Sequence, residues 1–286
     1  MTAAALSPAA ISAAFLAACL AELQALKPGN VHIHASGHGM QVAQFEAAAI
    51  AAAPAIADPA LNVGQRILRA TEKSFAAAQC NTNLGIVLLC APLAKAAAET
   101  DPGMGLRRRL ANILSALTIE DAIDAFAAIR IANPAGLGSA AKGDVHAAAS
   151  MTLIQAMHEA STRDRIANAY VTAYSDIFDF ALPALTAARA NTPTPELAIS
   201  VLHMSLLAEF PDSHIYRKFG EATAIEVQHE ARALKSRLDT ADAANTLARL
   251  SDFDKNLKAR GLNPGTTADF VVATLFTESL SARKQK

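Results

Sequence analysis

The sequence predicts an all-α protein that forms a single domain over residues 1–286. Alanine, leucine and isoleucine recur at helical spacing along almost the whole chain, whereas alternating β-branched runs are scarce. The breaks between apolar segments carry proline, glycine and asparagine, as at residues 101–103, 133–136 and 263–265. Because no low-complexity linker and no internal repeat interrupts this pattern, we expect one compact multi-helix domain or two tightly joined helical lobes.

The individual helices are placed by apolar periodicity and by the turn residues between them. Ser7 is a natural N-cap for the first helix, with Pro8 at its first position, and Thr118 with acids after it marks another helix start. Pro183 is expected to kink or divide the helix in which it lies. The pattern predicts about twelve helices, near residues 8–25, 42–53, 61–79, 83–99, 103–115, 118–131, 144–160, 164–189, 194–209, 213–236, 240–259 and 265–282.

Composition excludes several function classes. The chain is 52% hydrophobic with a net charge of −1, so we expect neither nucleic acid nor an anionic membrane surface as a partner. Cys19, Cys80 and Cys90 lack CxxC spacing and are expected to be free thiols in a reducing cytosol. The apolar stretch 3–26 has no Lys or Arg before it and is interrupted by polar residues near its end, so it predicts a helix of a cytoplasmic protein rather than a signal peptide or a membrane span.

A dense polar segment follows the first predicted helix. Pro28 restricts the backbone and Gly29 permits a positive φ, which predicts a defined loop. This loop carries groups that bind phosphate or move protons, namely Lys27, Asn30, His32, His34 and His38. A zinc site is less favoured, because no cysteine lies nearby and no HExxH motif exists.

Two further polar segments precede predicted helices. Asn81, Thr82 and Asn83 stand before an apolar helix, where they are candidates for anion binding at a helix N-terminus or for capping alone. The glycine-rich stretch 136–144 contains Lys142, which can neutralise phosphate charge, and Asp144, which can bind magnesium. It lacks the order of a Walker motif, and on spacing alone a flexible connection between helices is the better interpretation.

The last polar cluster combines residues 212–220 with residues 263–269. Arg217 and Lys218 follow Asp212 and suit a polyphosphate, or else form a solvated helical face. In the second stretch a Pro-Gly turn precedes a helix whose first turn can hold an anion through Gly265, Thr266 and Thr267. Asp269 adds an oxygen ligand for magnesium, with a helix-dipole role as the alternative.

Taken in order, these segments resemble the family of ATP:dephospho-coenzyme A triphosphoribosyltransferases. Residues 27–31 resemble its PKPG-(N/L)-V signature, preceded here by Glu22, and residues 37–40 resemble its G-x-H-x-D-M element. Residues 81–85, 212–220 and 263–269 are similar to its NT-H-K-G, D-T-N-x-x-x-R-G-G and S-P-G-G-S-A-D segments. The likeness covers nearly the whole chain.

The resemblance implies an all-α enzyme that displaces adenine from C1′ of ATP and joins the triphosphoribosyl group to a ribose hydroxyl of dephospho-CoA. Such chemistry needs neutralisation of the triphosphate, a proton for the departing adenine and a base near the acceptor hydroxyl. The resemblance implies a triphosphate site, with Mg²⁺ as cofactor, at Lys27, Arg217 and Lys218, and metal ligands at Asp144, Asp212 and Asp269. It implies proton transfer by His32 or His38 and a carboxylate near C1′ from Glu22. The further nucleotide contacts that it implies are Gly29, Asn30, Asn81, Thr82, Asn83, Lys142, Gly265, Thr266 and Thr267.

The sequence also departs from the family pattern. Asn83 and Leu84 stand where the family carries His-Lys, and Gly39 stands where a typical member has aspartate. At residues 30–32, 81–85 and 266–267 the chain looks more like a branch found in archaea and in bacteria that use methanopterin-type one-carbon coenzymes. Two alternatives therefore stay open: the same transfer onto a methanopterin- or folate-like precursor that carries a ribosyl hydroxyl, and a non-catalytic helical nucleotide-binding protein. Small-molecule substrates and a homodimer complete the expected partners.

Overall fold

The computed structural model describes residues 6–35, 37, 39–99, 103–136, 138 and 143–282. Within these residues the chain forms fourteen α-helices and one π-helix, and β-pairing is limited to two isolated bridges, which confirms the all-α prediction. The elements are α1 (Pro8–Gln24), α2 (Val42–Ala57), α3 (Val63–Ala78), α4 (Leu84–Ala98), α5 (Leu106–Ser115), α6 (Ile119–Ala132), α7 (Leu153–Ala160), α8 (Arg165–Val171), the π-helix η1 (Asp176–Ala181), α9 (Leu182–Asn191), α10 (Pro195–Glu209), α11 (Ser213–Phe219), α12 (Glu221–Lys235), α13 (Ala243–Ala259) and α14 (Gly265–Ala282).

The predicted helix starts that rest on capping chemistry are confirmed. The Ser7 hydroxyl accepts the backbone N–H of Ala10, and Pro8 is the first residue of α1. Thr118 and Asp121 form a reciprocal capping box at the start of α6, since each side chain accepts the backbone N–H of the other. None of the described helices combines the length and the apolarity that a membrane span requires.

Two predicted helices were wrong in extent. The segment 144–160 becomes helical only at Leu153, because Thr152 caps α7 and the residues before it form turns. The segment 213–236 is two helices rather than one, because Gly220 adopts a φ of +90° between α11 and α12. Both breaks change the direction of the chain, and the second one lets α11 and α12 run in different directions.

A third predicted helix, at 164–189, is interrupted in its middle. Ala173 and Tyr174 take positive φ values of 48° and 59°, and this ends α8. The chain then continues as η1 and α9, and Pro183 is the second residue of α9. The segment does divide, but at residues 173–174 and not at Pro183, so the break predicted at the proline is wrong in position.

Two tyrosines at this break contact the central helix α4. Pro92 lies inside α4 and has no N–H, so the carbonyl of Leu88 lacks the bond that a residue four positions later normally donates. The Tyr170 hydroxyl donates to this carbonyl at 2.7 Å, and the Tyr174 hydroxyl donates to the carbonyl of Leu89 at 3.0 Å. Both rings are fully enclosed. The Tyr170 hydroxyl thus supplies the donor that Pro92 cannot, from 82 residues further along the chain, and Tyr174 adds a second contact to α4 beside the break.

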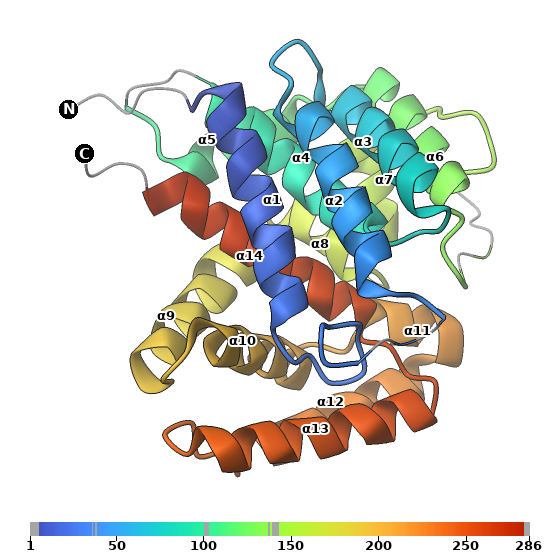
Figure 1. Ribbon diagram of the computed structural model, residues 1–286. Coiled ribbons are helices and arrows are strands. Elements are labelled where there is room, and N and C mark those ends of the chain that lie inside the picture. Colours follow the sequence, from blue (N-terminus) through green and yellow to red (C-terminus); the bar gives the residue numbers. More distant parts are fainter. Residues whose placement is uncertain are drawn as a thin grey trace.

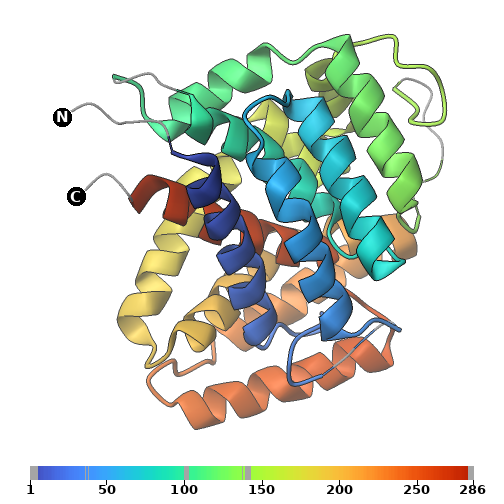
Figure 2. The same ribbon diagram turned by 45° about the horizontal axis from the view of Figure 1, so that its top comes forward.

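Two buried clusters organise the fold. The larger one surrounds α4 and α14, and α14 crosses behind α1 in Figure 1 while contacting α1, α4, α10 and α11. The smaller cluster joins α10, α11, α12 and α13 with Leu26 and Leu262. Helix α13 runs along one edge of the molecule, as Figure 1 and Figure 2 both show. The segment that follows α1 lies between the two clusters, where Lys27, Asn30 and His32 are buried, whereas His34 is exposed.

Candidate active site

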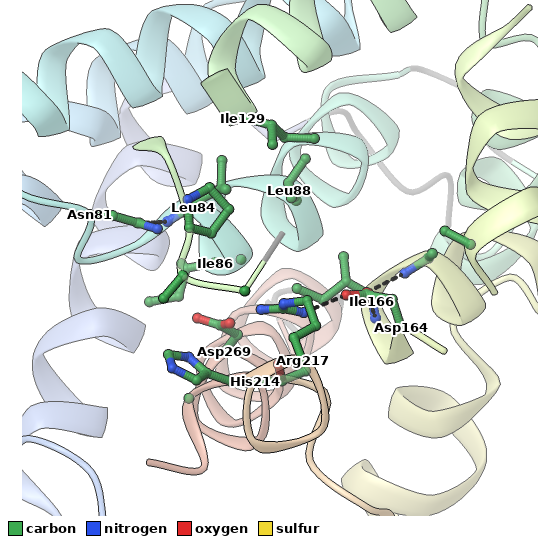
Figure 3. A pocket seen from close by; sticks show the side chains of 18 of the residues that line it. Asn81, Leu84, Ile86, Leu88, Ile129, Asp164, Ile166, His214, Arg217 and Asp269 are labelled. Carbon is green, nitrogen blue, oxygen red and sulfur yellow. Dashed lines mark hydrogen bonds and ion pairs between the residues drawn. The ribbon is translucent and has the colours of Figure 1, made fainter. Parts of the chain in front are cut away.

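A cavity of about 520 Å³ opens where several helix ends meet. Its wall comes from the end of α1, the starts of α4 and α14, helix α11, the α7–α8 region and the described part of the loop after α6. One side of the cavity is apolar and includes Leu88 and Ile129, whereas Asp269, His214 and Arg217 line the opposite side (Figure 3). A cavity with an apolar wall and a few convergent polar groups is typical of a small-molecule site.

The Asp269 carboxylate lies beside the start of α4. It has no hydrogen bond or ion pair within the described residues, and burial raises its pKa well above the usual range, with Asp212 and Glu22 adding repulsion. Gly85 makes this position accessible: a Cβ there would lie 2.0 Å from Asp269 Oδ2. The glycine of α4 therefore provides the space for the carboxylate of α14. Because no described side chain pairs with it, the Asp269 carboxylate can bind a ligand or a cation in the cavity.

Arg217 is oriented toward the cavity by Asp164. Its Nη1 donates to Asp164 Oδ2 at 2.6 Å, while Asp164 Oδ1 accepts two backbone N–H groups at the start of α8. Arg217 and His214 both lie on α11 and flank Asp269 in Figure 3. Gly265 allows the imidazole to approach α14, since a Cβ there would lie 2.8 Å from His214 Nδ1. The Asp164 carboxylate thus fixes the guanidinium in place, and the Arg217 side chain remains 22% exposed.

Two helix N-termini also reach the cavity. Asn81, Thr82 and Asn83 line it at the start of α4, where the Asn81 side chain accepts the backbone N–H of Leu84. Thr266 lines it from the first turn of α14. The first N–H groups of a helix have no intrahelical acceptor and favour anions, so these two starts and Arg217 form one electropositive wall.

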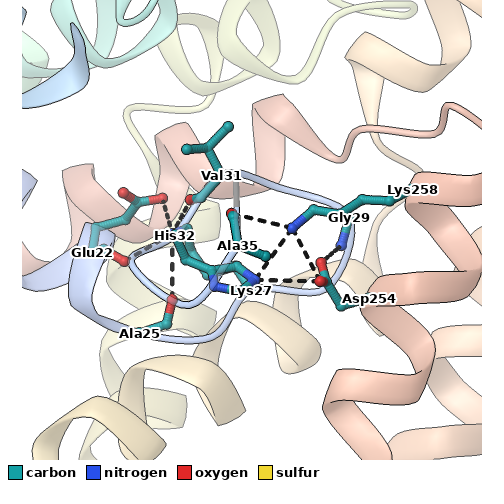
Figure 4. A network of polar contacts seen from close by, with 9 residues as sticks. All are labelled: Glu22, Ala25, Lys27, Gly29, Val31, His32, Ala35, Asp254 and Lys258. Carbon is teal, nitrogen blue, oxygen red and sulfur yellow. Dashed lines mark hydrogen bonds and ion pairs between the residues drawn. The ribbon is translucent and has the colours of Figure 1, made fainter. Parts of the chain in front are cut away.

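The Lys27 ammonium does not reach the cavity. It is fully buried, pairs with Glu22 Oε1 at 3.1 Å and donates to the carbonyls of Glu22 and Val31 at 2.9 and 2.8 Å (Figure 4). The carbonyl of Ala25 is a fourth, longer contact at 3.5 Å, so protein acceptors surround the three N–H groups of the ammonium. Burial lowers the pKa of Lys27, and the Glu22 carboxylate opposes this shift. Lys27 therefore fixes the loop, and it is Glu22 that lines the cavity.

His32 is likewise turned away from the cavity. Its Nε2 lies 3.5 Å from Asp254 Oδ2 and 3.4 Å from Lys258 Nζ, and Asp254 also accepts the backbone N–H of Gly29 (Figure 4). Burial lowers the pKa of His32. Gly29 has a φ of +82°, and a Cβ there would lie 2.7 Å from Pro264. This network attaches the loop to α13 and to the chain that leads into α14.

The predicted site residues divide into three groups. Those that line the cavity are Glu22, Asn30, Asn81, Thr82, Asn83, Asp144, Arg217, Gly265, Thr266 and Asp269. Those outside its lining are Lys27, Gly29, His32, Asp212, Lys218 and Thr267. His38 and Lys142 lie outside the described residues.

Physical reasons explain two members of the second group. Asp212 accepts the backbone N–H groups of His214 and Ile215 through one oxygen, and the N–H and hydroxyl of Thr267 through the other. Its carboxylate therefore joins α11 to α14. Lys218 is exposed, with its ammonium 5.1 Å from the ring centroid of Phe219. Adjacent residues on a helix point in directions about 100° apart, so only Arg217 of the predicted basic pair faces the cavity.

Several cavity residues were missed by the sequence interpretation, notably Asp164, His214 and Asn263. His214 and Asn263 lie inside segments that were singled out, but nothing local indicates that these side chains face a ligand. Asp164 carried only the signal of a helix N-cap. Its pairing with Arg217 joins residues 53 positions apart, and sequence spacing does not reveal such a contact.

Comparison with known proteins shows the family of this chain. A family model for ATP:dephospho-CoA triphosphoribosyl transferase matches residues 8–286, whereas no curated protein matches the chain. A crystal structure from Archaeoglobus fulgidus, provisionally assigned as a triphosphoribosyl-dephospho-CoA synthase, is similar with a TM-score of 0.65 and 23% identity, over 83% of this chain and 98% of that one. Its likeness shows a shared fold, and neither comparison names a methanopterin-dependent protein. The chain therefore belongs to the ATP:dephospho-CoA triphosphoribosyl transferase family, whose members are transferases that move the triphosphoribosyl group of ATP to dephospho-CoA.

Proposed function

We propose that the cavity between α1, α4, α11 and α14 is where this transfer takes place. The C1′–N9 bond of ATP breaks, a ribose hydroxyl oxygen of dephospho-CoA bonds to C1′, and adenine leaves. One observation carries the proposal: a cation at Arg217, an unpaired carboxylate at Asp269 and the buried carboxylate of Glu22 line one cavity although they come from three distant segments. These are the groups that a triphosphate, its metal ion and a cationic sugar require.

The triphosphate is proposed to bind at the electropositive wall. Arg217 supplies a planar donor group whose direction is set by Asp164, and guanidinium groups bind phosphate oxygens through paired hydrogen bonds. The starts of α4 and α14 add backbone N–H groups near Asn83 and Thr266. This assignment replaces the predicted phosphate roles of Lys27 and Lys218, whose ammonium groups face elsewhere.

Magnesium is proposed to bind together with the triphosphate. Among the described residues no group of three or more His, Cys, Asp and Glu side chains could hold a metal by itself. Mg²⁺ is commonly held by only one or two carboxylates plus substrate phosphates. Asp269, which has no hydrogen bond or ion pair among the described residues, and Asp144, which lines the same cavity, fit this arrangement. When bound, the ion would neutralise phosphate charge, whereas Asp212 is excluded because both of its oxygens hold helix ends.

The carboxylate of Glu22 is proposed to face C1′. Positive charge develops at this carbon as the bond to adenine breaks, and a fixed carboxylate stabilises it. Lys27 holds Glu22 in place from the side that faces the protein. His214 is the histidine that lines the cavity in the described part of the chain, so we propose that it takes the proton of the acceptor hydroxyl, in place of the predicted His32.

The test is to incubate the purified protein with ATP, Mg²⁺ and dephospho-CoA. The expected products are free adenine and dephospho-CoA enlarged by a triphosphoribosyl group, identified by chromatography and mass spectrometry. Formation of ADP or AMP in place of adenine would rule out the proposed chemistry. The His214→Gln variant is expected to retain ATP binding and to lose most of the turnover.

Two further properties are part of the proposal. A cytoplasmic location agrees with cysteines that are free thiols, since Cys19 and Cys90 are buried and unpaired. A homodimer is retained from the sequence interpretation and is tested by analytical ultracentrifugation of the full chain. Because the family is one of transferases that use dephospho-CoA, we propose neither the methanopterin-type acceptor nor the non-catalytic alternative.

A further inference from the structure

Two asparagines form a side-chain pair at the cavity wall. The Asn30 Nδ2 donates to Asn263 Oδ1 at 2.8 Å, and both residues line the cavity. Each is only 7% exposed. The pair joins the loop after α1 to the residues that lead into α14, which are 233 positions apart in the sequence. The function proposed above gives this pair no role.

The pair leaves both donors and acceptors unused. Its internal bond consumes one N–H of Asn30 and one lone pair of Asn263 Oδ1, so Asn30 Oδ1, the second N–H of Asn30 and Asn263 Nδ2 remain. Neither Asn30 Oδ1 nor Asn263 Nδ2 has a hydrogen bond within the described residues, and neither is among the enclosed polar atoms that lack a partner. Because both side chains line the cavity, Asn30 Oδ1 can serve as an acceptor and Asn263 Nδ2 as a donor for a ligand there.

The backbone holds both amides in place. The N–H of Asn30 donates to the carbonyl of Lys27 at 3.0 Å, and the carbonyl of Asn263 accepts the N–H of Gly265 at 2.8 Å. Lys27 also binds the carbonyl of Val31, directly after Asn30. An acceptor–donor pair on a fixed backbone suits a rigid planar ligand, since little side-chain freedom is lost on binding.

We infer that this pair reads the N7–N6 edge of the adenine of ATP, an inference that rests on the function proposed above. Adenine presents an acceptor at N7 beside a donor at N6, the complement of Asn263 Nδ2 and Asn30 Oδ1. Hypoxanthine and guanine present two acceptors on this edge, so their O6 would face Asn30 Oδ1. The pair therefore selects ATP as the donor nucleotide.

The position of Glu22 indicates which adenine is read, because ATP and dephospho-CoA both carry one. Lys27 contacts Glu22 Oε1 and the carbonyl after Asn30 at the same time, so the carboxylate and the amide are held at a fixed spacing. In ATP the base is bonded directly to C1′, the carbon assigned to Glu22. A group that acts on C1′ and a group that binds the adjoining base must be held at a fixed distance from each other. The adenine of the acceptor, by contrast, need not lie near the reacting carbon.

The same contact assists the departure of adenine. When the C1′–N9 bond breaks, its electron pair stays with N9 and is delocalised toward N7. The N–H of Asn263 donates a hydrogen bond to N7 and stabilises this charge. The acceptor oxygen bonds to C1′ and loses its proton, while adenine gains one proton overall, so atoms and charge balance.

The inference is tested by calorimetric binding of ATP, 7-deaza-ATP and ITP to the wild type and to two variants. Wild type is expected to bind 7-deaza-ATP, which lacks N7, and ITP, which carries O6, about tenfold or more weakly than ATP. Asn263→Ala is expected to lose the discrimination against 7-deaza-ATP, and Asn30→Ala to lose that against ITP. Asn112→Ala, on the exposed face of α5, is the matched control and should behave as wild type.

Several results would overturn the inference. Equal binding of the three nucleotides by wild type would do so, and this arm needs no folded variant. Weakened binding of 2′-deoxy-ATP with unchanged 7-deaza-ATP would place the pair on the ribose instead. If Asn263→Ala weakened dephospho-CoA and not ATP, the pair would read the acceptor. Adenine release by wild type tests the proposed function separately, so release without nucleotide discrimination would sink only the inference.

Discussion

Replacing Gly85 by alanine tests whether the position of the Asp269 carboxylate is required for transfer. The added Cβ would lie 2.0 Å from Asp269 Oδ2 and 2.5 Å from its Cγ, with Ile166 at 2.9 Å on another side. An ordinary contact begins at 3.4 Å, so the carboxylate must move by about 1.4 Å. The backbone itself tolerates alanine, because Gly85 is helical and its φ is not positive.

The expected effects on stability and on activity differ. Alanine favours the helix by up to about 1 kcal/mol, whereas overpacking costs about 1–3 kcal/mol, so the net change in unfolding free energy is about 2 kcal/mol or less. A displacement of about 1 Å at a reacting centre can lower turnover about 100-fold, which corresponds to about 2.7 kcal/mol in activation free energy. We therefore expect Gly85→Ala to remain folded and to lose most of its adenine release.

The assay measures adenine release by chromatography alongside the melting temperature. Gly105→Ala is the matched control, since Gly105 precedes α5 with a φ of −66° and a Cβ there meets no atom within 4 Å. Wild-type turnover in Gly85→Ala would refute the proposed role of Asp269. A loss of activity that merely parallels unfolding would refute the claim that the effect is local. In an Asp269→Asn background, Gly85→Ala should cost little further activity.

Three further predictions concern charge. Lys27→Met leaves Glu22 buried without a counter-charge and should lower the unfolding free energy, measured in urea, by about 3–5 kcal/mol, much of which a second change, Glu22→Gln, should restore. Burial lowers the pKa of His203 to about 3 from 6.5, so the unfolded chain binds a proton that the folded chain excludes, and stability should fall by about 2.3 kcal/mol as the pH drops from 6.5 to 4.5. His203→Leu should remove this part of the acid sensitivity in urea titrations at the two pH values. Arg217→Ala should weaken ATP binding by about 1.5–3 kcal/mol in calorimetry, with a smaller effect for Asp164→Asn, which keeps the cation.

Each of these has an outcome that contradicts it. If Lys27→Met kept its stability but lost ATP binding, the ammonium would belong to the nucleotide site, as the sequence first suggested. An unchanged acid transition in His203→Leu would mean that other groups dominate acid unfolding. If Arg217→Ala bound ATP as wild type does, the triphosphate would have to lie elsewhere in the cavity.

The local chemistry of the chain was sufficient to predict most of the secondary structure. Ser7, Thr118 and the Pro-Gly turn before α14 specify helix ends through contacts within a few residues, and these ends are found where expected. The break at Tyr174 was not predictable in this way. It accompanies a hydrogen bond from the Tyr174 hydroxyl to the carbonyl of Leu89 in α4, and a contact over such a separation has no local signature.

For the candidate site, too, the sequence determined some features and the tertiary structure decided others. Sequence alone determined that this is an all-α chain whose polar groups gather at helix ends, and in which segments, because caps, turns and periodicity are properties of neighbouring residues. Only the tertiary structure decided which of those groups meet a ligand. Lys27 and His32 turn inward to hold a loop, while Arg217 and His214 face the cavity. The rotation of a helix about its axis is set by what it packs against, and that information lies in residues far along the chain.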